Sequence, residues 1–194
     1  MRPVPWTYVN SWRCIACGIC CKEYDVALRF NEWLKIVKTY GVEVTVPGLN
    51  KMFLKRRSDG SCVFLRKVGN LWICSLQNSL KPQACKLWPF KIYTYPRYGQ
   101  ERQAIFKYNG KKFYIYIDPN CIGIRWGKPS QSLIEKTIPE FIQIALGYNQ
   151  IQRYSTANVS NLIIQQLTKP KTIPFQIVRL TVNAVGRSIH RRYT

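Results

Sequence analysis

The amino-acid sequence predicts an α+β fold, with a small cysteine-rich domain that contains β-hairpins and a basic helical extension towards the C-terminus. Three observations support this prediction. Four of the eight cysteines fall within residues 14–21. Two alternating aromatic segments flank Asn109-Gly110, the dipeptide favoured in two-residue hairpin turns. No cysteine follows Cys121 and no acidic residue follows Glu140, so the composition changes along the chain.

Local patterns predict the first elements. Residues 26–41 have apolar side chains at helical spacing, with Asn31 as the expected N-cap and Gly41 as the expected end of the helix. Residues 42–48 alternate and predict a short strand that Pro47 ends.

Turn signals place two hairpins after this strand. Asp59-Gly60 predicts a turn, and Gly69-Asn70 predicts the turn of a hairpin over residues 62–74. The second hairpin, at the asparagine–glycine dipeptide named above, delivers the last cysteine near the end of its second strand.

The remaining sequence has a helical pattern. Residues 132–154 read as helix, with Pro139 starting or kinking its second part, and residues 158–171 read as a shorter helix. The tail, 173–194, has an apolar stripe interrupted by arginines. We therefore divide the chain into two parts: a cysteine-cluster domain over 1–128 and a basic helical extension over 129–194.

The first four cysteines predict a metal site. Cys14, Cys17 and Cys20 step by three, and Cys21 follows directly. A disulfide needs Cα atoms roughly 4.4–6.8 Å apart, which adjacent or three-apart cysteines rarely reach. A tight loop can instead converge several thiolates on one ion or cluster. The spacing is typical of an iron–sulfur cluster (4Fe–4S) in one interpretation and compatible with zinc in the other.

The other four cysteines are Cys62, Cys74, Cys85 and Cys121, each beside a predicted turn. Eight ligands suit two four-ligand sites, or one cluster and one zinc, so two metal sites are one expectation. We expect the domain to require bound metal in order to fold. If residues 20 and 21 are extended, their side chains point to opposite sides and serve two sites or bridge two metals. The alternative is that isolated cysteines are small buried hydrophobes.

The N-terminal sequence and the lack of long apolar runs predict the cellular compartment. The first twelve residues lack the apolar segment of a secretory signal, and no run reaches the roughly 18 apolar residues of a transmembrane helix. We therefore expect a cytoplasmic protein, in which thiols stay reduced and cysteine spacing points to metal rather than disulfides.

The net charge of +21 indicates a polyanionic partner, with nucleic acid as the prediction and an anionic membrane or acidic protein as the alternatives. We predict RNA because no DNA-binding motif is evident, specifically ribosomal RNA, with other ribosomal proteins as further partners. Tyr93, Tyr95 and Tyr108 lie among the basic groups and could stack on bases. The predicted contacts are Lys51, Lys55, Arg56, Arg57, Arg66, Lys67, Lys107, Lys111, Lys112, Arg179, Arg187, Arg191 and Arg192.

The sequence contains no recognisable catalytic apparatus. There is no Walker loop, GxGxxG or GxSxG motif, so no nucleotide cofactor is expected. The single histidine, His190, lies among arginines and is interpreted as a bystander or a phosphate contact. We therefore expect a binding protein, and keep as the alternative an iron–sulfur or iron-dependent enzyme acting on a macromolecule.

Four segments resemble a known family. The run C-x-x-C-x-x-C-C at 14–21, GSCVFL at 60–65, Cys74 and KPQACKLWPF at 81–90 resemble the CxxCxxCC family of YkgJ-like cysteine-cluster proteins. The resemblance extends over about residues 14–125. It implies a domain that chelates zinc or iron through the matching cysteines.

Two departures from the family pattern are visible. Lys81 stands before Pro82 where the family has arginine, and Ile122 replaces the proline of a Cys-Pro-Gly element. A similar cluster occurs in bacterial flagellin lysine methylases, so the resemblance gives the enzymatic alternative a possible reaction, lysine modification. No glycine-rich methyl-donor motif accompanies it here. Taken together, the sequence predicts a metal-binding cysteine-cluster protein that binds structured RNA as a ribosomal or ribosome-associated accessory protein.

Overall fold

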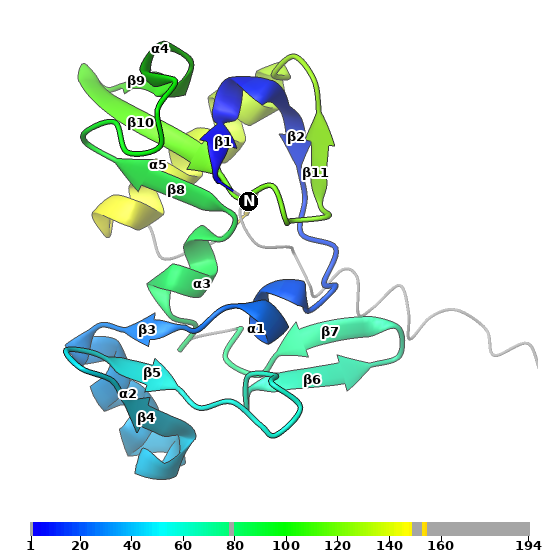
Figure 1. Ribbon diagram of the computed structural model, residues 1–194, viewed down its shortest axis with the longest axis vertical. Helices are drawn as coiled ribbons and strands as arrows, with labels where there is room; N and C mark the ends of the chain where they lie inside the picture. Colours follow the sequence, from blue (N-terminus) through cyan, green and yellow to red (C-terminus); the bar gives the residue numbers. More distant parts are fainter. Residues whose placement is uncertain (1, 78–79, 149–152, 155–194) are drawn as a thin grey trace, which may run out of the picture.

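The computed structural model describes residues 2–77, 80–148 and 153–154, and these have the predicted α+β fold. The strands form several small antiparallel sheets instead of one large one. Figure 1 shows two halves arranged along the long axis of the molecule, each with its own sheets and helix.

The first half is built around β10, the longest strand. One edge of β10 pairs with β8, and the other edge pairs with β9 and then β1. A separate pair, β2 with β11, packs against the same core. The strands of this half are β1 (Val4–Pro5), β2 (Val9–Trp12), β8 (Phe90–Tyr93), β9 (Ile105–Tyr108), β10 (Lys111–Ile117) and β11 (Ile124–Trp126). Two short helical elements join them, η1 (Trp6–Tyr8) and α4 (Glu101–Ala104).

The first core lies between this sheet and two consecutive helical segments, η3 (Leu133–Thr137), a π-helical turn, and α5 (Ile138–Leu146). Pro139 lies in the first turn of α5, where its missing N–H breaks no helical hydrogen bond. Gly147 ends α5 in a left-handed conformation. The buried residues of this core are Val9, Trp12, Phe90, Phe106, Phe113, Ile115, Ile117, Ile124, Leu133, Ile138, Phe141 and Ile142.

The second half has a three-stranded sheet, in the order β3-β5-β4, and a hairpin of β6 and β7. Its elements are β3 (Ala27–Leu28), α2 (Phe30–Tyr40), η2 (Val42–Val44), β4 (Thr45–Pro47), β5 (Met52–Leu54), β6 (Leu65–Val68) and β7 (Leu71–Cys74). The buried residues of this second core are Leu28, Ile36, Leu54, Cys62, Phe64, Leu65 and Leu76.

The predicted helix over residues 26–41 begins later than expected. Ala27–Leu28 pairs with β5 as a strand, so only the part from Phe30 is helical. The predicted N-cap, Asn31, is wrong: the cap is Arg29, whose backbone N–H donates to the Glu32 carboxylate at 2.9 Å. Gly41, at φ 86°, ends the helix as predicted. The pairing of residues 26–28 with a distant strand overrides their helical periodicity.

Both hairpins are confirmed. Asn109 and Gly110 have φ of 48° and 72°, as a type I′ turn requires, and Lys111 lies opposite Tyr108. The hairpin predicted over residues 62–74 turns at Gly69, with φ 58°, between β6 and β7. The predicted turn at Asp59-Gly60 is also present, since Gly60 has φ 78°.

Two short helices, α1 (Ile19–Glu23) and α3 (Gln83–Leu87), connect the halves (Figure 1). Gln83 makes the connection directly. Its backbone N–H donates to Glu32 of α2 at 2.7 Å, and its side-chain amide donates to the carbonyl of Ile144 in α5 at 2.6 Å. The region between the cores is therefore fixed to both.

The predicted division at residue 128 stays a prediction. Residues 133–146 are helical and complete the first core, but the helix predicted over 132–154 is too long, because it ends at Gly147. The buried Glu140 accepts hydrogen bonds from the backbone N–H groups of Arg153 and Tyr154 at 2.9–3.1 Å. The predicted helix over 158–171 and the tail lie outside the described residues. No helix in the described ranges has both the length and the apolar character needed to cross a membrane.

Candidate metal centre

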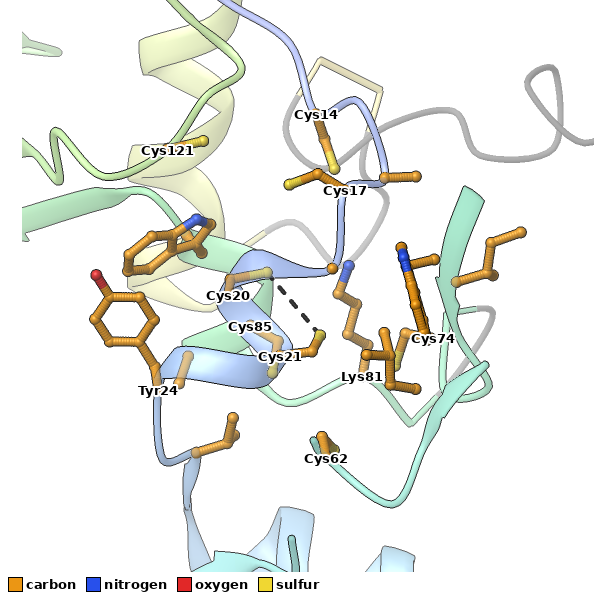
Figure 2. Close-up of a pocket in the computed structure, with 18 of the residues that line it drawn as sticks. Cys14, Cys17, Cys20, Cys21, Tyr24, Cys62, Cys74, Lys81, Cys85 and Cys121 are labelled. Carbon is orange, nitrogen blue, oxygen red and sulfur yellow. Dashed lines mark hydrogen bonds between the residues drawn. The ribbon is translucent and has the colours of Figure 1, made fainter. Parts of the chain in front are cut away.

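One cavity of about 260 Å³ is lined by all eight cysteines. It lies between the two cores: Cys14 and Cys121 pack against the first, and Cys21, Cys62 and Cys74 belong to or pack against the second. Figure 2 shows cysteine side chains entering this space from segments that are distant in the sequence. The fold therefore gathers the thiols that the sequence singled out.

The loop between Cys14 and α1 owes its shape to two left-handed residues. Ala16 has φ 53° and Gly18 has φ 75°. The carbonyl of Ala16 accepts the backbone N–H of Trp72 at 2.8 Å, which ties the loop to β7. A Cβ on Gly18 would lie 2.8 Å from the Cβ of Trp72, so glycine is required by both conformation and space.

Cys20 and Cys21 lie in the helix α1, so our expectation of an extended segment is wrong. Their sulfurs are 4.0 Å apart and face the same cavity. In a tetrahedral site with metal–sulfur bonds of about 2.3 Å, two sulfurs lie roughly 3.8 Å apart. The pair is therefore spaced as two ligands of one metal, and α1 turns both residues inward instead of separating them.

The four later cysteines come from different elements. Cys62 is buried, and its backbone N–H donates to the carbonyl of Cys21 at 2.9 Å. Cys74 is the last residue of β7, and Cys85 lies within α3. Cys121 follows β10 in a turn, where the indole N–H of Trp12 donates to its sulfur at 3.2 Å.

The thiols divide into two electrostatically coupled groups. Cys14 and Cys17 both raise the pKa of Cys121, and these three residues form the three-thiol group. Cys20, Cys62 and Cys74 act in the same way on Cys85. The five-thiol group, which Figure 2 shows around the end of α1, consists of Cys20, Cys21, Cys62, Cys74 and Cys85. Of the three regularly spaced cysteines, Cys14 and Cys17 thus belong to the three-thiol group and Cys20 to the five-thiol group.

Most of these thiols resist ionisation. Burial raises the pKa of Cys62, Cys74, Cys85 and Cys121 above the ordinary value. Within the adjacent pair, hydrogen bonding from Cys21 lowers the pKa of Cys20 to about 7. The same hydrogen bond, with burial, raises the pKa of Cys21. The pair therefore holds one thiolate near neutral pH, whereas the buried thiols need a cation to become thiolates.

Lys81 lines the cavity and was not among the predicted site residues. Its ammonium donates to Gln77 Oε1 at 2.9 Å, and its charge lowers the pKa of Cys20, Cys74 and Cys85. Figure 2 shows its side chain drawn among the thiols of the five-thiol group. In the sequence, the only indication of this role is that Lys81 lies four residues before a cysteine, Cys85.

Tyr24 lines the same cavity close to a second polar network. Its ring packs against that of Trp88 in a tilted arrangement, with centroids 4.3 Å apart. Its hydroxyl donates to the buried Asp118 at 3.4 Å and accepts from the Asn120 amide at 2.9 Å. Lys91, which also lines the cavity, lies 3.9 Å from the other Asp118 oxygen.

The donor set fits a thiophilic metal or an iron–sulfur cluster. All eight cysteines are free thiols, and no histidine or disulfide competes in the lining. Among the residues that the structure describes, no three cysteine, histidine or carboxylate side chains are already grouped as ligands of one ion. The sulfurs thus surround the cavity and would have to converge when metal binds.

Nine of the thirteen predicted nucleic-acid contacts lie in the described residues. Eight of these are exposed, and Arg56 is half-buried. Arg56 pairs with Asp25 at 3.0 Å and donates to the carbonyls of Gly60 and Lys22. Arg57 donates to Val63 at 2.6 Å and to the Ser61 hydroxyl. These two arginines fasten the loop that carries Cys62.

The remaining predicted contacts on the described surface are seven exposed side chains: Lys51, Lys55, Arg66, Lys67, Lys107, Lys111 and Lys112. The ammonium of Lys67 lies 5.9 Å from the ring centre of Trp72, and that of Lys22 lies 4.0 Å from it. Arg179, Arg187, Arg191 and Arg192 lie outside the described residues, as does His190.

A comparison with protein families finds one match. The family model CxxCxxCC, described as "Putative zinc- or iron-chelating domain", matches residues 13–121. The matched segment contains all eight cysteines. Neither the comparison with curated proteins nor that with solved structures found a match.

Proposed function

Because the chain belongs to the CxxCxxCC family of zinc- or iron-chelating domains, we propose that a metal centre in the thiol cavity joins its two cores and is required for the fold. The observation that carries this proposal is that all eight thiols line one cavity between the cores. Removing the metal leaves buried thiols and an unfilled space, so metal binding and folding are coupled.

The size and donors of the cavity favour an iron–sulfur cluster over a single zinc ion. Its volume of about 260 Å³ exceeds the roughly 150 Å³ of an engineered cavity that binds benzene, so a polyatomic group can fit. The five-thiol group supplies the four thiolates that such a cluster needs. The cationic Lys81 offsets part of the negative charge of a thiolate-ligated centre.

The three-thiol group would form a second, smaller site. Cys14, Cys17 and Cys121 are one ligand short of the four that a closed structural zinc site uses. A fourth ligand from solvent or a partner would leave this position open. The bound group would supply charge neutralisation and cross-linking, while the protein residues orient it and exclude water.

Metal content and the visible spectrum of the purified protein test this proposal. We expect iron with sulfide and a broad visible absorption, and we expect the protein to unfold when the metal is removed. A double Cys62→Ser/Cys85→Ser variant should lose the cluster, whereas Cys14→Ser/Cys121→Ser should retain its absorption. A protein that is fully folded without metal contradicts the proposal, and equimolar zinc without iron overturns the choice of cluster.

We also propose that the protein binds structured RNA in the cytoplasm, as an accessory protein of the ribosome. Its net charge of +21 supports this, because nine acidic residues cannot neutralise thirty basic ones. Lys107 and Lys112 provide a specific observation: they face each other directly across β9 and β10. Like charges in that position repel, and a bound phosphate relieves the repulsion.

Co-sedimentation with ribosomes tests the RNA proposal. We expect the tagged protein to travel with ribosomal particles at low salt and to dissociate as salt rises. Replacing the exposed basic residues of β9 and β10 by Gln should weaken this association. If the protein stays at the top of the gradient and binds no purified ribosomal RNA, the proposal fails.

One observation favours a second candidate, an iron-dependent enzyme acting on a macromolecule, for example on protein lysine. The three-thiol group would leave an open coordination position on a bound metal, and the Tyr24 network lies on the same cavity. Complete ligation by four cysteines at every bound metal would exclude this candidate, whereas an exchangeable ligand would support it.

A further inference from the structure

The sheet of the first half has a second face, which is rich in tyrosine. Because side chains alternate along a strand, Tyr114 and Tyr116 lie opposite the side that faces the first core. Both are buried there beneath the segment 94–104, with Tyr93 and Tyr98 packed against them. The Tyr116 hydroxyl donates to the carbonyl of Gly99 at 2.9 Å, which holds this segment in place.

Two aromatic features lie at the edge of this face. The side chain of Tyr95 is exposed at 57%, and its ring centre lies 6.2 Å from that of Tyr93. The guanidinium of Arg97 lies over the Tyr93 ring at 5.1 Å. Pro96 follows Tyr95 and restricts its backbone to extended conformations. An exposed, conformationally restricted ring of this kind loses little entropy when it stacks on a ligand.

A pair of lysines lies next to these rings. Tyr93 is opposite Tyr114, and Lys112 is two residues before Tyr114 on the same face of β10. Lys107 lies directly opposite Lys112 and therefore shares that face. β8 ends at Tyr93, so the lysine pair lies just beyond the end of this strand, on the face of the sheet that carries the Tyr93 ring. The Tyr93 ring, which Tyr95 and Arg97 adjoin, and the two lysines are thus on the same face.

The charged residues around this surface are mostly basic. Residues 91–112 contain six Lys or Arg and one acidic residue, Glu101. The Glu101 carboxylate accepts a hydrogen bond from the Tyr114 hydroxyl at 3.1 Å. An anionic lipid surface would neutralise the charge of the lysines, but it contains no flat ring on which Tyr95 could stack. A nucleic-acid duplex offers phosphates, but its bases are stacked on one another. An unpaired strand offers both phosphates and free base faces.

We propose that Tyr95, the Arg97–Tyr93 stack and the Lys107–Lys112 pair form a binding surface for an unpaired RNA segment, with a base on Tyr95 and phosphates on the lysines. This inference rests on the proposed RNA binding and names its surface. This surface would suit the unpaired loops of a structured RNA, because the bases of such a loop are exposed while the adjoining RNA helices stay paired.

Fluorescence anisotropy of the metal-loaded full chain tests the proposal. The probes are an unpaired RNA of about twelve nucleotides, within the range of known single-strand sites, and the same sequence as a duplex. Tyr95→Ala should weaken binding of the unpaired RNA about 5- to 100-fold, the range of base–aromatic stacking. Tyr95→Phe, which keeps the ring, should stay within about twofold. Tyr148→Ala, at another exposed tyrosine, is the control.

The lysine pair is tested by salt dependence. Lys107→Gln/Lys112→Gln should flatten the log–log salt slope by about 1.4, at roughly 0.7 per single-strand phosphate contact. The matched pair Lys35→Gln/Lys38→Gln, on exposed positions of α2, should leave the slope unchanged.

The possible outcomes separate this inference from the broader one. If the wild type binds no RNA, the proposed RNA function fails, and this surface fails with it. If the wild type binds but Tyr95→Ala and the lysine variant bind equally well, the surface assignment alone fails. Equal affinity for the duplex, or loss of binding to anionic lipid vesicles without any change in RNA binding, also overturns it.

Discussion

The indole N–H of Trp12 donates a hydrogen bond to the sulfur of Cys121, 3.2 Å away. Trp12 also packs edge-on against Phe90 and Phe141, so one side chain belongs to the first core and to the lining of the cavity. The hydrogen bond lowers the pKa of Cys121 and partly offsets the effect of burial, which raises it. Through this contact the first core therefore affects the ionisation of Cys121, one member of the three-thiol group.

Trp12→Phe should weaken both the fold and this group. The variant loses the hydrogen bond to sulfur and leaves a small void, so the free energy of unfolding should fall by roughly 1–3 kcal/mol. Denaturant titration measures this change. Trp126→Phe is the control, since Trp126 is exposed at 55% and its replacement should cost less than about 0.5 kcal/mol. Equal effects of the two substitutions would contradict the assigned role.

Metal affinity should increase with pH. Burial raises the pKa of Cys62, Cys74 and Cys85, so these thiols are protonated at neutral pH and lose protons when metal binds. In the metal-bound fold the same groups are thiolates, so their effective pKa lies below that of the unfolded chain. The stability they contribute is therefore present at high pH and is lost as pH falls.

Competition with a chelator between about pH 6 and 8, where ordinary thiols are protonated, measures this dependence. We expect the logarithm of affinity to rise by about one unit per pH unit for each buried thiol that becomes a ligand. Cys20, with its pKa of about 7, should contribute less above neutrality. A pH-independent affinity would show that these thiols are not ligands.

Gly18→Ala should be more destabilising than the same change in an open turn. An added Cβ would meet Trp72 at 2.8 Å, in a backbone conformation with φ 75° that alanine disfavours by about 1–2 kcal/mol. Gly110→Ala is the matched control, because its φ is 72° and no atom lies within 4 Å of the added Cβ. The difference between the two unfolding free energies isolates the contact with Trp72, and we expect it to exceed about 1 kcal/mol.

Lys81→Met should loosen the centre held by the five-thiol group. The substitution removes the positive charge that lowers the pKa of Cys20, Cys74 and Cys85. We expect about a tenfold loss of metal affinity, typical of residues that support ligands without binding metal themselves. Lys81→Arg keeps the charge and should retain most of the affinity. The role of charge is contradicted if the Arg variant loses as much affinity as the Met variant in chelator competition.

The sequence by itself determined the local features and the chemical character of this protein. The hairpin turn at Asn109-Gly110 follows from the backbone preferences of two adjacent residues, and the end of α2 at Gly41 follows from one. The eight cysteines indicated a thiol-based metal centre, whereas the polyanionic partner indicated by the net charge stays a prediction. Such features need no knowledge of distant contacts.

The tertiary structure alone decided how these residues are used. Regular spacing grouped Cys20 with Cys14 and Cys17, but the turn of α1 places it in the five-thiol group. Lys81 was noted only as part of a motif, and the fold places it in the thiol cavity. Arg56 was predicted to contact nucleic acid, and the fold pairs it with Asp25. Pairing between distant segments sets these positions, because burial and electrostatic energy depend on which groups meet in space, and sequence separation does not encode that.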